Sequence, residues 1–338
     1  MSEFRYDLIH DRYTLIAPNR LNRPNLLRDI SISKKSNSSS CPFCQGHEYM
    51  TPPEIYSIRD FNGKWLTRVV PNLYKALQIE TPFESREEGI YDKESGFGAH
   101  EIIIDTPKHI EQFETLSIDE ISIWFETIAQ RVRDLKRDKR LQYFSIFKNQ
   151  GKNAGHTIEH IHTQLMALPL LPREQFNILK HLYSYYQEHG RSVFKDCIDY
   201  EIDEGVRVID ESQNFLAYCP YASSYPFEII IMPKIDKAYI DYFSSDELKE
   251  FASLLKSSLT LLKSEIGLFD YNLYIQNPPA HKNFETKDYF DDIDNFYRCY
   301  LRIIPRLYRQ GGFEMQNCMN INPLEPQKAA KLLLQHKG

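Results

Sequence analysis

The 338-residue sequence has no long hydrophobic run, and this absence is the first limit on the class of protein. No segment approaches the roughly 18 consecutive apolar residues that a membrane-spanning helix needs. The N-terminus, MSEFRYDLIHDRY, is charged rather than apolar. We therefore expect neither membrane insertion nor export through a leader, and we predict a cytoplasmic protein. Dense basic runs are also missing and the net charge is −6, so a general nucleic-acid-binding surface is not expected.

Cysteine is scarce and scattered. Of the six cysteines only Cys41 and Cys44 are close together, which does not make a disulfide framework in a chain of this length. The Cys-x-x-Cys pair is spaced for one edge of a tetrahedral zinc site. No second pair completes that site, so histidines would have to supply the other ligands. Idle thiols or a redox pair are alternatives that the residues alone leave open.

The pattern of apolar residues predicts an α+β protein. Hydrophobic residues make up 42% of the chain, which is ample for one large core or two ordinary ones. A predicted strand at 100–105, a helix at 117–135 opened by a serine cap, and a strand at 142–149 precede a loop and a further strand. The same order returns in the second half, at 227–233, 244–267, 271–277 and 297–305.

This recurrence indicates a duplicated chain. Glu228 follows Glu101 by 127 positions, and Asn277 follows Asn149 by 128. In the last strand of the second half, the sequence alignment places Tyr300 and Arg302 against a pair of histidines, His160 and His162. Only the first copy therefore carries histidine chemistry.

The stretch FKNQGKNAGHTIEHIHTQLMALP, residues 147–169, holds that chemistry. On a strand, alternate residues share a face, so His160, His162 and Gln164 point the same way. A solvated strand face would explain them. Alternatively, one imidazole binds a metal or attacks an electrophile while its neighbours position the target. The preceding glycine-rich loop suits backbone N–H groups turned toward an anion, and the nearby side chains Lys148, Lys152 and Thr157 would add donors.

Several further motifs accompany this strand: DRYTLIAPNRLNRP, CPFCQGHE, TPPEI, RVVPNLYKAL, HEIIIDTPKH, ALPLLP and GGFEMQNCMNINPLEPQKAA. In these motifs and their order, the sequence resembles the galactose-1-phosphate uridylyltransferase family, a branch of the histidine-triad superfamily. The resemblance implies two histidine-triad-like repeats, each an antiparallel sheet (half-barrel) with packed helices. Residues 1–190 would carry the zinc site and the catalytic strand, and residues 191–338 would form the copy without catalytic histidines.

The resemblance also implies a reaction. His162 would attack the α-phosphorus of a UDP-sugar, form a uridylyl-histidine and release a sugar 1-phosphate, which another sugar 1-phosphate replaces in a ping-pong cycle. Gln164 would hydrogen-bond the transferred phosphoryl group. Related hydrolases carry a histidine at this position; glutamine cannot supply a proton, which favours transfer to a phosphate over release of an alcohol or amine.

The remaining site residues come from the resemblance. It assigns one structural zinc per chain to Cys41, Cys44, His109 and His160, whereas His47 and His100 are interpreted as ordinary surface or strand histidines. Contacts with the UDP-sugar and sugar 1-phosphate, some of them often made across a homodimer interface, are assigned to Arg20, Arg23, Asn72, Asn149, Asn153, Thr157, Glu314 and Asn320.

In the second copy, some family members bind another metal, but here Tyr300, Arg302 and Gln276 replace the ligands. We expect that site to hold no metal and a buried Arg302 to face an acidic partner. The nearest candidates in sequence are Glu285, Asp288, Asp291 and Asp292.

Three functions are compatible with these residues. The leading prediction is a hexose-1-phosphate uridylyltransferase, which converts UDP-glucose and galactose 1-phosphate to glucose 1-phosphate and UDP-galactose. A nucleotidylyltransferase with another base or acceptor, such as ADP-glucose with inorganic phosphate, is the second. A zinc-stabilised nucleotide-binding protein without turnover is the third, and the presence of both His162 and Gln164 counts against it. Departures from the family pattern at His156, Glu159 and Ile161 bear on substrate detail more than on mechanism.

Overall fold

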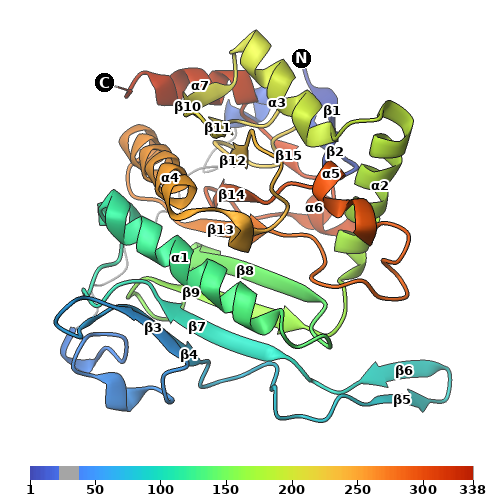
Figure 1. Cartoon of the computed structure of the whole chain (residues 1–338). Coiled ribbons are helices and arrows are strands. Elements are labelled where there is room, and N and C mark those ends of the chain that lie inside the picture. The colour runs from blue at the N-terminus through green and yellow to red at the C-terminus, as the bar shows by residue number, and fades with distance from the viewer. Residues whose placement is uncertain (23–37, 338) are drawn as a thin grey trace.

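A computed structural model describes residues 1–22 and 38–337 of the chain (Figure 1). Its centre is one ten-stranded sheet in which every neighbouring pair of strands is antiparallel. The predicted α+β class is confirmed. From edge to edge the strands are β10 (Val208–Glu211), β11 (Phe215–Tyr218), β12 (Ile229–Pro233), β14 (Tyr300–Pro305), β13 (Tyr271–Gln276), β8 (Tyr143–Gln150), β9 (His162–Leu168), β7 (Ala99–Ile104), β4 (Trp65–Pro71) and β3 (Tyr56–Arg59).

The sheet is built from two halves with the same strand order. Outward from the central pair, β8, β9, β7, β4 and β3 on one side match β13, β14, β12, β11 and β10 on the other. Because β13 hydrogen-bonds to β8, both halves share one continuous sheet. The division of the chain near residue 190 stays a prediction.

The register places Gln164 and Arg302 in one row across the sheet. Phe147 on β8 pairs with Gln164 and with Tyr274 on β13, and Tyr274 pairs with Arg302. On the other side, Ile102 pairs with Gln164 and Ile230 with Arg302. The alignment of Tyr300 and Arg302 with His160 and His162 stays a prediction.

Two long helices cover one face of the sheet side by side, α1 (Ile118–Leu135) and α4 (Ser245–Ile266) (Figure 1). Each begins with a serine whose side chain accepts a backbone N–H while a glutamate bonds back, a capping box that Ser117 and Ser244 form. The two helices contact each other through Phe125 on α1 and Phe251 on α4, whose rings stack with centroids 4.6 Å apart. The helices predicted at 117–135 and 244–267 are confirmed.

Other elements cover the second half and the ends of the sheet. Helices α2 (Arg173–His189) and α3 (Val193–Glu204) pack with β11, β12 and β14 through a second apolar cluster. Strands β1 (Glu3–Asp7), β2 (Arg12–Ile16) and β15 (Ile321–Asn322) form a small sheet, and the hairpin β5 (Ser85–Glu88) and β6 (Tyr91–Glu94) projects from the body (Figure 1). The chain ends with α5 (Ile293–Phe296), α6 (Gly312–Asn317) and α7 (Pro326–Leu334). Among the described residues, no helix combines the length and apolar character needed to cross a membrane.

Candidate active site and metal centre

The face of β9 opposite α1 carries the polar side chains. Thr163 and Leu165 point into the core beneath α1, where Trp124 donates its indole N–H to Thr163 Oγ1 at 2.9 Å. His162 and Gln164 lie on the other face, as predicted from their alternate spacing. His160 lies just before the strand, where Ile161 bonds through its N–H to the Ile110 carbonyl at 3.1 Å.

The imidazole of His162 is fixed with one nitrogen as a donor. Its Nδ1 lies 2.9 Å from the carbonyl oxygen of His160, and a carbonyl can only accept, so Nδ1 carries the proton and Nε2 keeps its lone pair. Burial lowers the pKa of His162 to about 4. The ring packs edge-on against Phe43 at a centroid distance of 5.3 Å. The result is a neutral imidazole whose Nε2 has the lone pair that a nucleophile needs.

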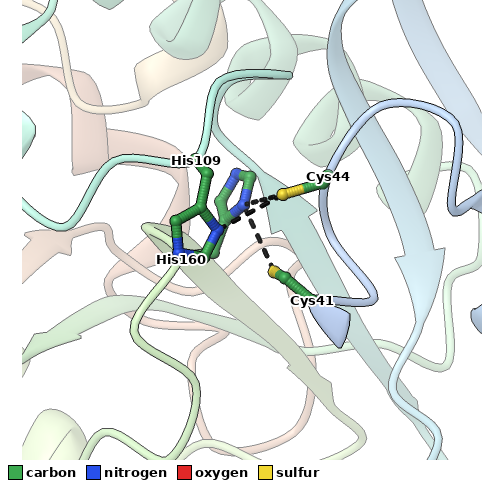
Figure 2. A group of neighbouring side chains, drawn as sticks. All are labelled: Cys41, Cys44, His109 and His160. Carbon is green, nitrogen blue, oxygen red and sulfur yellow. Dashed lines mark hydrogen bonds between the residues drawn. The ribbon is translucent and has the colours of Figure 1, made fainter. Parts of the chain in front are cut away.

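Four side chains from three separate segments of the chain meet in a cluster that includes His160 (Figure 2). The possible ligand atoms of Cys41, Cys44, His109 and His160 all lie within 4.8 Å of one another. Cys44 Sγ is 3.2 Å from His109 Nδ1, and His160 Nδ1 is 3.6 Å from Cys41 Sγ and 3.7 Å from Cys44 Sγ. Two ligands on one tetrahedral zinc, one sulfur and one nitrogen, would be about 3.5 Å apart given the usual bond lengths. The donor set and its spacing therefore fit a zinc ion.

His160 is oriented as a metal ligand needs. Its Nε2 lies 2.8 Å from the Thr106 carbonyl, so Nε2–H donates there and the lone pair of Nδ1 faces the sulfurs. The side chain is fully buried, and this burial lowers the pKa of His160 to about 4. An imidazole held neutral in this way is ready to bind a cation. The structure thus brings together all four predicted metal ligands.

A buried ion pair supports the backbone of His162. Lys148 on β8 pairs with Asp105, and its Nζ also donates to the His162 carbonyl at 2.9 Å. Asp105 accepts a further bond from Thr163 Oγ1 at 2.9 Å. The prediction that Lys148 offers a donor to an anion is wrong, because the whole side chain is buried and engaged inside the sheet.

The glycine-rich loop also differs from its prediction. Gly151 has a φ of +84°, and a Cβ there would meet the side chain of Asp270. Asp270 in turn accepts the Asn153 N–H at 2.7 Å. The N–H groups of Gly155 and His156 donate to carbonyls of the same loop. The loop is closed by bonds within the protein, so these N–H groups do not form an anion cradle here.

Gln164 contacts a residue that the sequence interpretation set aside. His100 on β7 lies with its Nε2 3.0 Å from Gln164 Oε1 and 3.1 Å from Asn72 Nδ2. Its Nδ1 accepts the backbone N–H of Ala76 at 3.2 Å. The structure therefore places Asn72, predicted to lie near the nucleotide, two contacts from the predicted catalytic amide.

The other predicted substrate residues are dispersed. Asn149 accepts from Asn272 at 2.9 Å, and Thr157 is exposed on the loop. Arg20 is exposed in a short 3-10 helix, and Arg23 lies outside the described residues. Their roles stay predictions.

Two predicted sugar contacts lie in the C-terminal segment. Glu314 is buried and accepts the Gly311 N–H at 2.9 Å, while Asn320 accepts from Gln310 at 2.8 Å. These side-chain contacts join the two residues to their own segment rather than to His162. Their role in binding a sugar also stays a prediction.

In the second half, Arg302 has the acidic partner that was predicted, but not a candidate from the loop. Its Nε donates to Glu228 at 2.5 Å and its Nη1 to Tyr274 Oη at 2.6 Å. Glu228 lies just before β12, the strand beside β14, so strand order and not nearness in sequence decides the partner. Tyr300 Oη lies 2.7 Å from His10 Nε2.

Comparison with known families agrees with this geometry. The family description "Galactose-1-phosphate uridyl transferase, N-terminal domain" matches residues 1–172, and its C-terminal counterpart matches residues 178–274. The chain belongs to the galactose-1-phosphate uridyl transferase family, whose members transfer nucleotidyl groups, so the predicted membership is confirmed.

Individual relatives carry two different names. The chain is 32% identical to the ADP-glucose phosphorylase of Arabidopsis thaliana over 336 residues, which covers 98% of this chain and 92% of the relative. It is 26% identical to the galactose-1-phosphate uridylyltransferase of Thermotoga maritima, covering 98% of each. A solved structure of the Arabidopsis phosphorylase with bound ADP-glucose superimposes with a TM-score of 0.82 at 27% identity and 99% coverage of both chains.

Proposed function

We propose that this chain is a nucleotidylyltransferase that works through a covalent nucleotidylyl-histidine at His162. The observation that carries the proposal is the buried, neutral His162 imidazole, with Nδ1–H held by the His160 carbonyl and Nε2 left as the nucleophile. Imidazole is a good nucleophile when unprotonated, and the phosphoramidate it forms is reactive enough to pass the group on.

The proposed cycle has two displacements. His162 Nε2 attacks the α-phosphorus of a nucleoside diphosphate sugar, a P–N bond forms, and the P–O bond to the sugar phosphate breaks. In the second step an oxygen of the acceptor phosphate attacks the same phosphorus and the P–N bond breaks. A sugar phosphate leaves as a stable anion, so no general acid is essential. Gln164 lies beside His162 on the strand face and serves as a hydrogen-bonding group for the phosphoryl oxygens.

Two versions of this reaction fit the site. The uridylyl version, UDP-glucose with galactose 1-phosphate, is the one that the sequence predicts. The adenylyl version, ADP-glucose with phosphate, is supported by the 32% identity to the Arabidopsis ADP-glucose phosphorylase. Both versions use the same nucleophile and differ only in the base and the acceptor. A protein that binds nucleotide without turnover would have no use for an oriented His162 beside Gln164.

We propose that the cluster of Cys41, Cys44, His109 and His160 holds one zinc ion per chain. With four protein ligands the ion would have no open position, so its role would be stability rather than activation of water. His160 lies two residues before His162, so a fixed His160 also fixes the nucleophile. All six cysteines are free, and since cysteine ligands must stay reduced, we propose a cytoplasmic location.

We keep the predicted substrate contacts as part of this proposal. The side chains of Glu314 and Asn320 bond to Gly311 and Gln310 of the C-terminal segment. A homodimer that places this segment of one protomer at the His162 site of its partner would give both residues their predicted role. The substrate residues proposed are Arg20, Arg23, Asn72, Asn149, Asn153, Thr157, Glu314 and Asn320.

One experiment tests the reaction and separates its two versions. The protein is incubated with UDP-glucose or ADP-glucose labelled at the α-phosphate, and the protein is analysed for label that is stable to base and labile to acid. Label from one nucleotide and not the other fixes the base, and its release by inorganic phosphate or by galactose 1-phosphate fixes the acceptor. Absence of label from both sugars, with sugar 1-phosphate nevertheless released, would show that the chemistry does not pass through a protein intermediate.

A further inference from the structure

We propose that His100 is a positioning residue that decides which end of the Gln164 amide faces the reacting phosphoryl group. The inference rests on the proposed function, since it concerns the residue beside the proposed nucleophile. It starts from three contacts that converge on one imidazole, from Ala76, Gln164 and Asn72.

The first contact fixes the tautomer of His100. The backbone N–H of Ala76 points at Nδ1 at 3.2 Å, and a backbone amide can only donate. Nδ1 must therefore be the unprotonated nitrogen, which puts the proton of the neutral ring on Nε2. The ring is 9% exposed, so bulk water has little access with which to compete for either nitrogen.

The second contact then fixes Gln164. An amide offers an oxygen that accepts and an NH2 group that donates, and rotation by half a turn exchanges them. Because His100 Nε2 carries a proton, it bonds to the amide only when Oε1 faces it, at the observed 3.0 Å. The NH2 group of Gln164 is then directed away from His100, and phosphoryl oxygens, which only accept, need such a donor.

The third neighbour of His100, Asn72, lies in the loop after β4. Asn72 Oδ1 accepts the Tyr74 N–H at 2.9 Å, so the Asn72 NH2 group is also fixed, 3.1 Å from His100 Nε2. Two donors cannot bond to each other, so in this tautomer the Asn72 NH2 is held in place and needs an acceptor elsewhere. A bound nucleotide would supply such an acceptor.

The contact is built into the sheet. On β9 Gln164 pairs with Ile102, and His100 is two residues before that partner, so the two side chains meet on the diagonal of an antiparallel pair. In the second half, Arg302 pairs with Ile230, and Glu228, two residues before it, meets Arg302 in the same way. The same diagonal holds an interacting pair in both halves, so the His100 contact follows from the register rather than from a chance rotamer.

A spectroscopic measurement tests the tautomer without relying on activity. Protein labelled with ¹⁵N-histidine is examined by two-bond ¹H–¹⁵N correlation, and the His100 signal is identified as the one of eleven histidine signals that disappears in His100→Gln. We expect a ring with Nδ1 unprotonated and Nε2 protonated. A ring protonated on Nδ1, or on both nitrogens at pH 7.5, would overturn the inference whether or not the protein is an enzyme.

A kinetic double-mutant cycle tests the route through Gln164. His100→Leu, which removes both bonds, should slow formation of the labelled intermediate by about 10- to 100-fold, the usual cost of removing a residue that orients a reacting group. The KM for the nucleotide sugar should change by less than about threefold in the same variant. His100→Gln offers an acceptor and a donor on one side chain and should recover most of the rate.

The decisive comparison is the same change in the Gln164→Ala background. If His100 acts by orienting Gln164, then His100→Leu should have almost no further effect there, because no amide is left to orient. An equal loss in both backgrounds would overturn the inference. His181→Leu, on α2 with its Nε2 2.8 Å from the Leu8 carbonyl, is the control for a general effect of losing a histidine. If wild-type protein forms no label from either nucleotide sugar, the proposed function fails, and the spectroscopic test still decides the tautomer.

Discussion

Replacing Lys148 by methionine should destabilise the protein strongly and displace the backbone of His162. The side chains of Lys148 and Asp105 are both fully buried, and they form an ion pair. Loss of hydration lowers the pKa of Lys148 and raises that of Asp105, and each partner's charge offsets that cost for the other. Methionine fills a similar volume but removes the charge, so Asp105 keeps only the bond from Thr163 at 2.9 Å.

The size of the effect follows from what is left unpaired. Removing one partner of a buried ion pair costs about 3 to 5 kcal/mol, because the other charge stays buried without compensation. The His162 carbonyl also loses the donor that lies 2.9 Å away. The double variant Lys148→Met/Asp105→Asn also removes the charge of the second partner. It should recover most of the lost stability, since replacing a whole buried pair is often close to neutral.

Urea unfolding followed by tryptophan fluorescence measures the free energy of unfolding, with Trp124 as a probe close to the ion pair. Trp124 donates to Thr163, which donates to Asp105, so its indole reports directly on this network. The other tryptophan, Trp65, is replaced by phenylalanine in every protein compared. Lys93→Met removes a lysine from an exposed pair with Glu88 and should change stability little.

Two results would refute the reasoning. A loss below about 1 kcal/mol in Lys148→Met would mean that Asp105 does not bear an uncompensated charge. A double variant no more stable than the single one would mean that the packing of the lysine stem, and not its charge, is what matters. In either case Lys148 could not be described as the ionic support of the His162 backbone.

Four further outcomes follow from the site. His162→Gly should keep the fold and its melting temperature but give no labelled protein from any nucleotide sugar. Gln164→Ala should slow both half-reactions by roughly 100- to 1000-fold, the usual cost of one oriented donor, measured by single-turnover kinetics. Elemental analysis should find one zinc per chain, and Cys44→Ser or a strong chelator should reduce the metal content and the melting temperature together. Arg302→Met should lower the stability of the protein, because it leaves the buried Glu228 carboxylate unpaired. Adding Glu228→Gln to that variant should recover most of the lost stability. If Arg302→Met is as stable as wild type, the two residues do not form a buried ion pair.

Local patterns in the sequence predicted the elements well. The serine cap of the helix at 117–135 and the alternation along β9 are short-range signals, and the structure has both. The four ligand residues needed more than local pattern, since Cys41 and His160 are 119 positions apart and only the family resemblance joined them. The structure brings these four side chains together, with their sulfur and nitrogen atoms at the spacing that ligands of one metal ion would have.

The errors have a common physical origin. Lys148 was predicted to be an anion donor because it lies beside the glycine-rich loop, whereas the sheet brings it to Asp105, 43 positions earlier in the chain. Arg302 was paired with loop carboxylates because they are near in sequence, whereas the sheet order brings Glu228 beside it. His100 is a strand histidine, as predicted, and lies outside the metal cluster; the role proposed for it depends on the diagonal register with Gln164. Long-range pairing, and not residue type, was the missing information.

The two halves of the sheet use one diagonal for opposite purposes. In the first half it joins two neutral groups, His100 and Gln164, and the amide keeps a free NH2 group to offer to a ligand. In the second half it joins opposite charges, Glu228 and Arg302, and Tyr274 accepts a further guanidinium hydrogen bond. A neutral pair leaves hydrogen-bonding capacity at the surface of the site, whereas a compensated ion pair consumes it. The same diagonal thus holds a hydrogen-bonded amide in one half and an ion pair in the other, and only the first arrangement suits the proposed contact of Gln164 with a phosphoryl group.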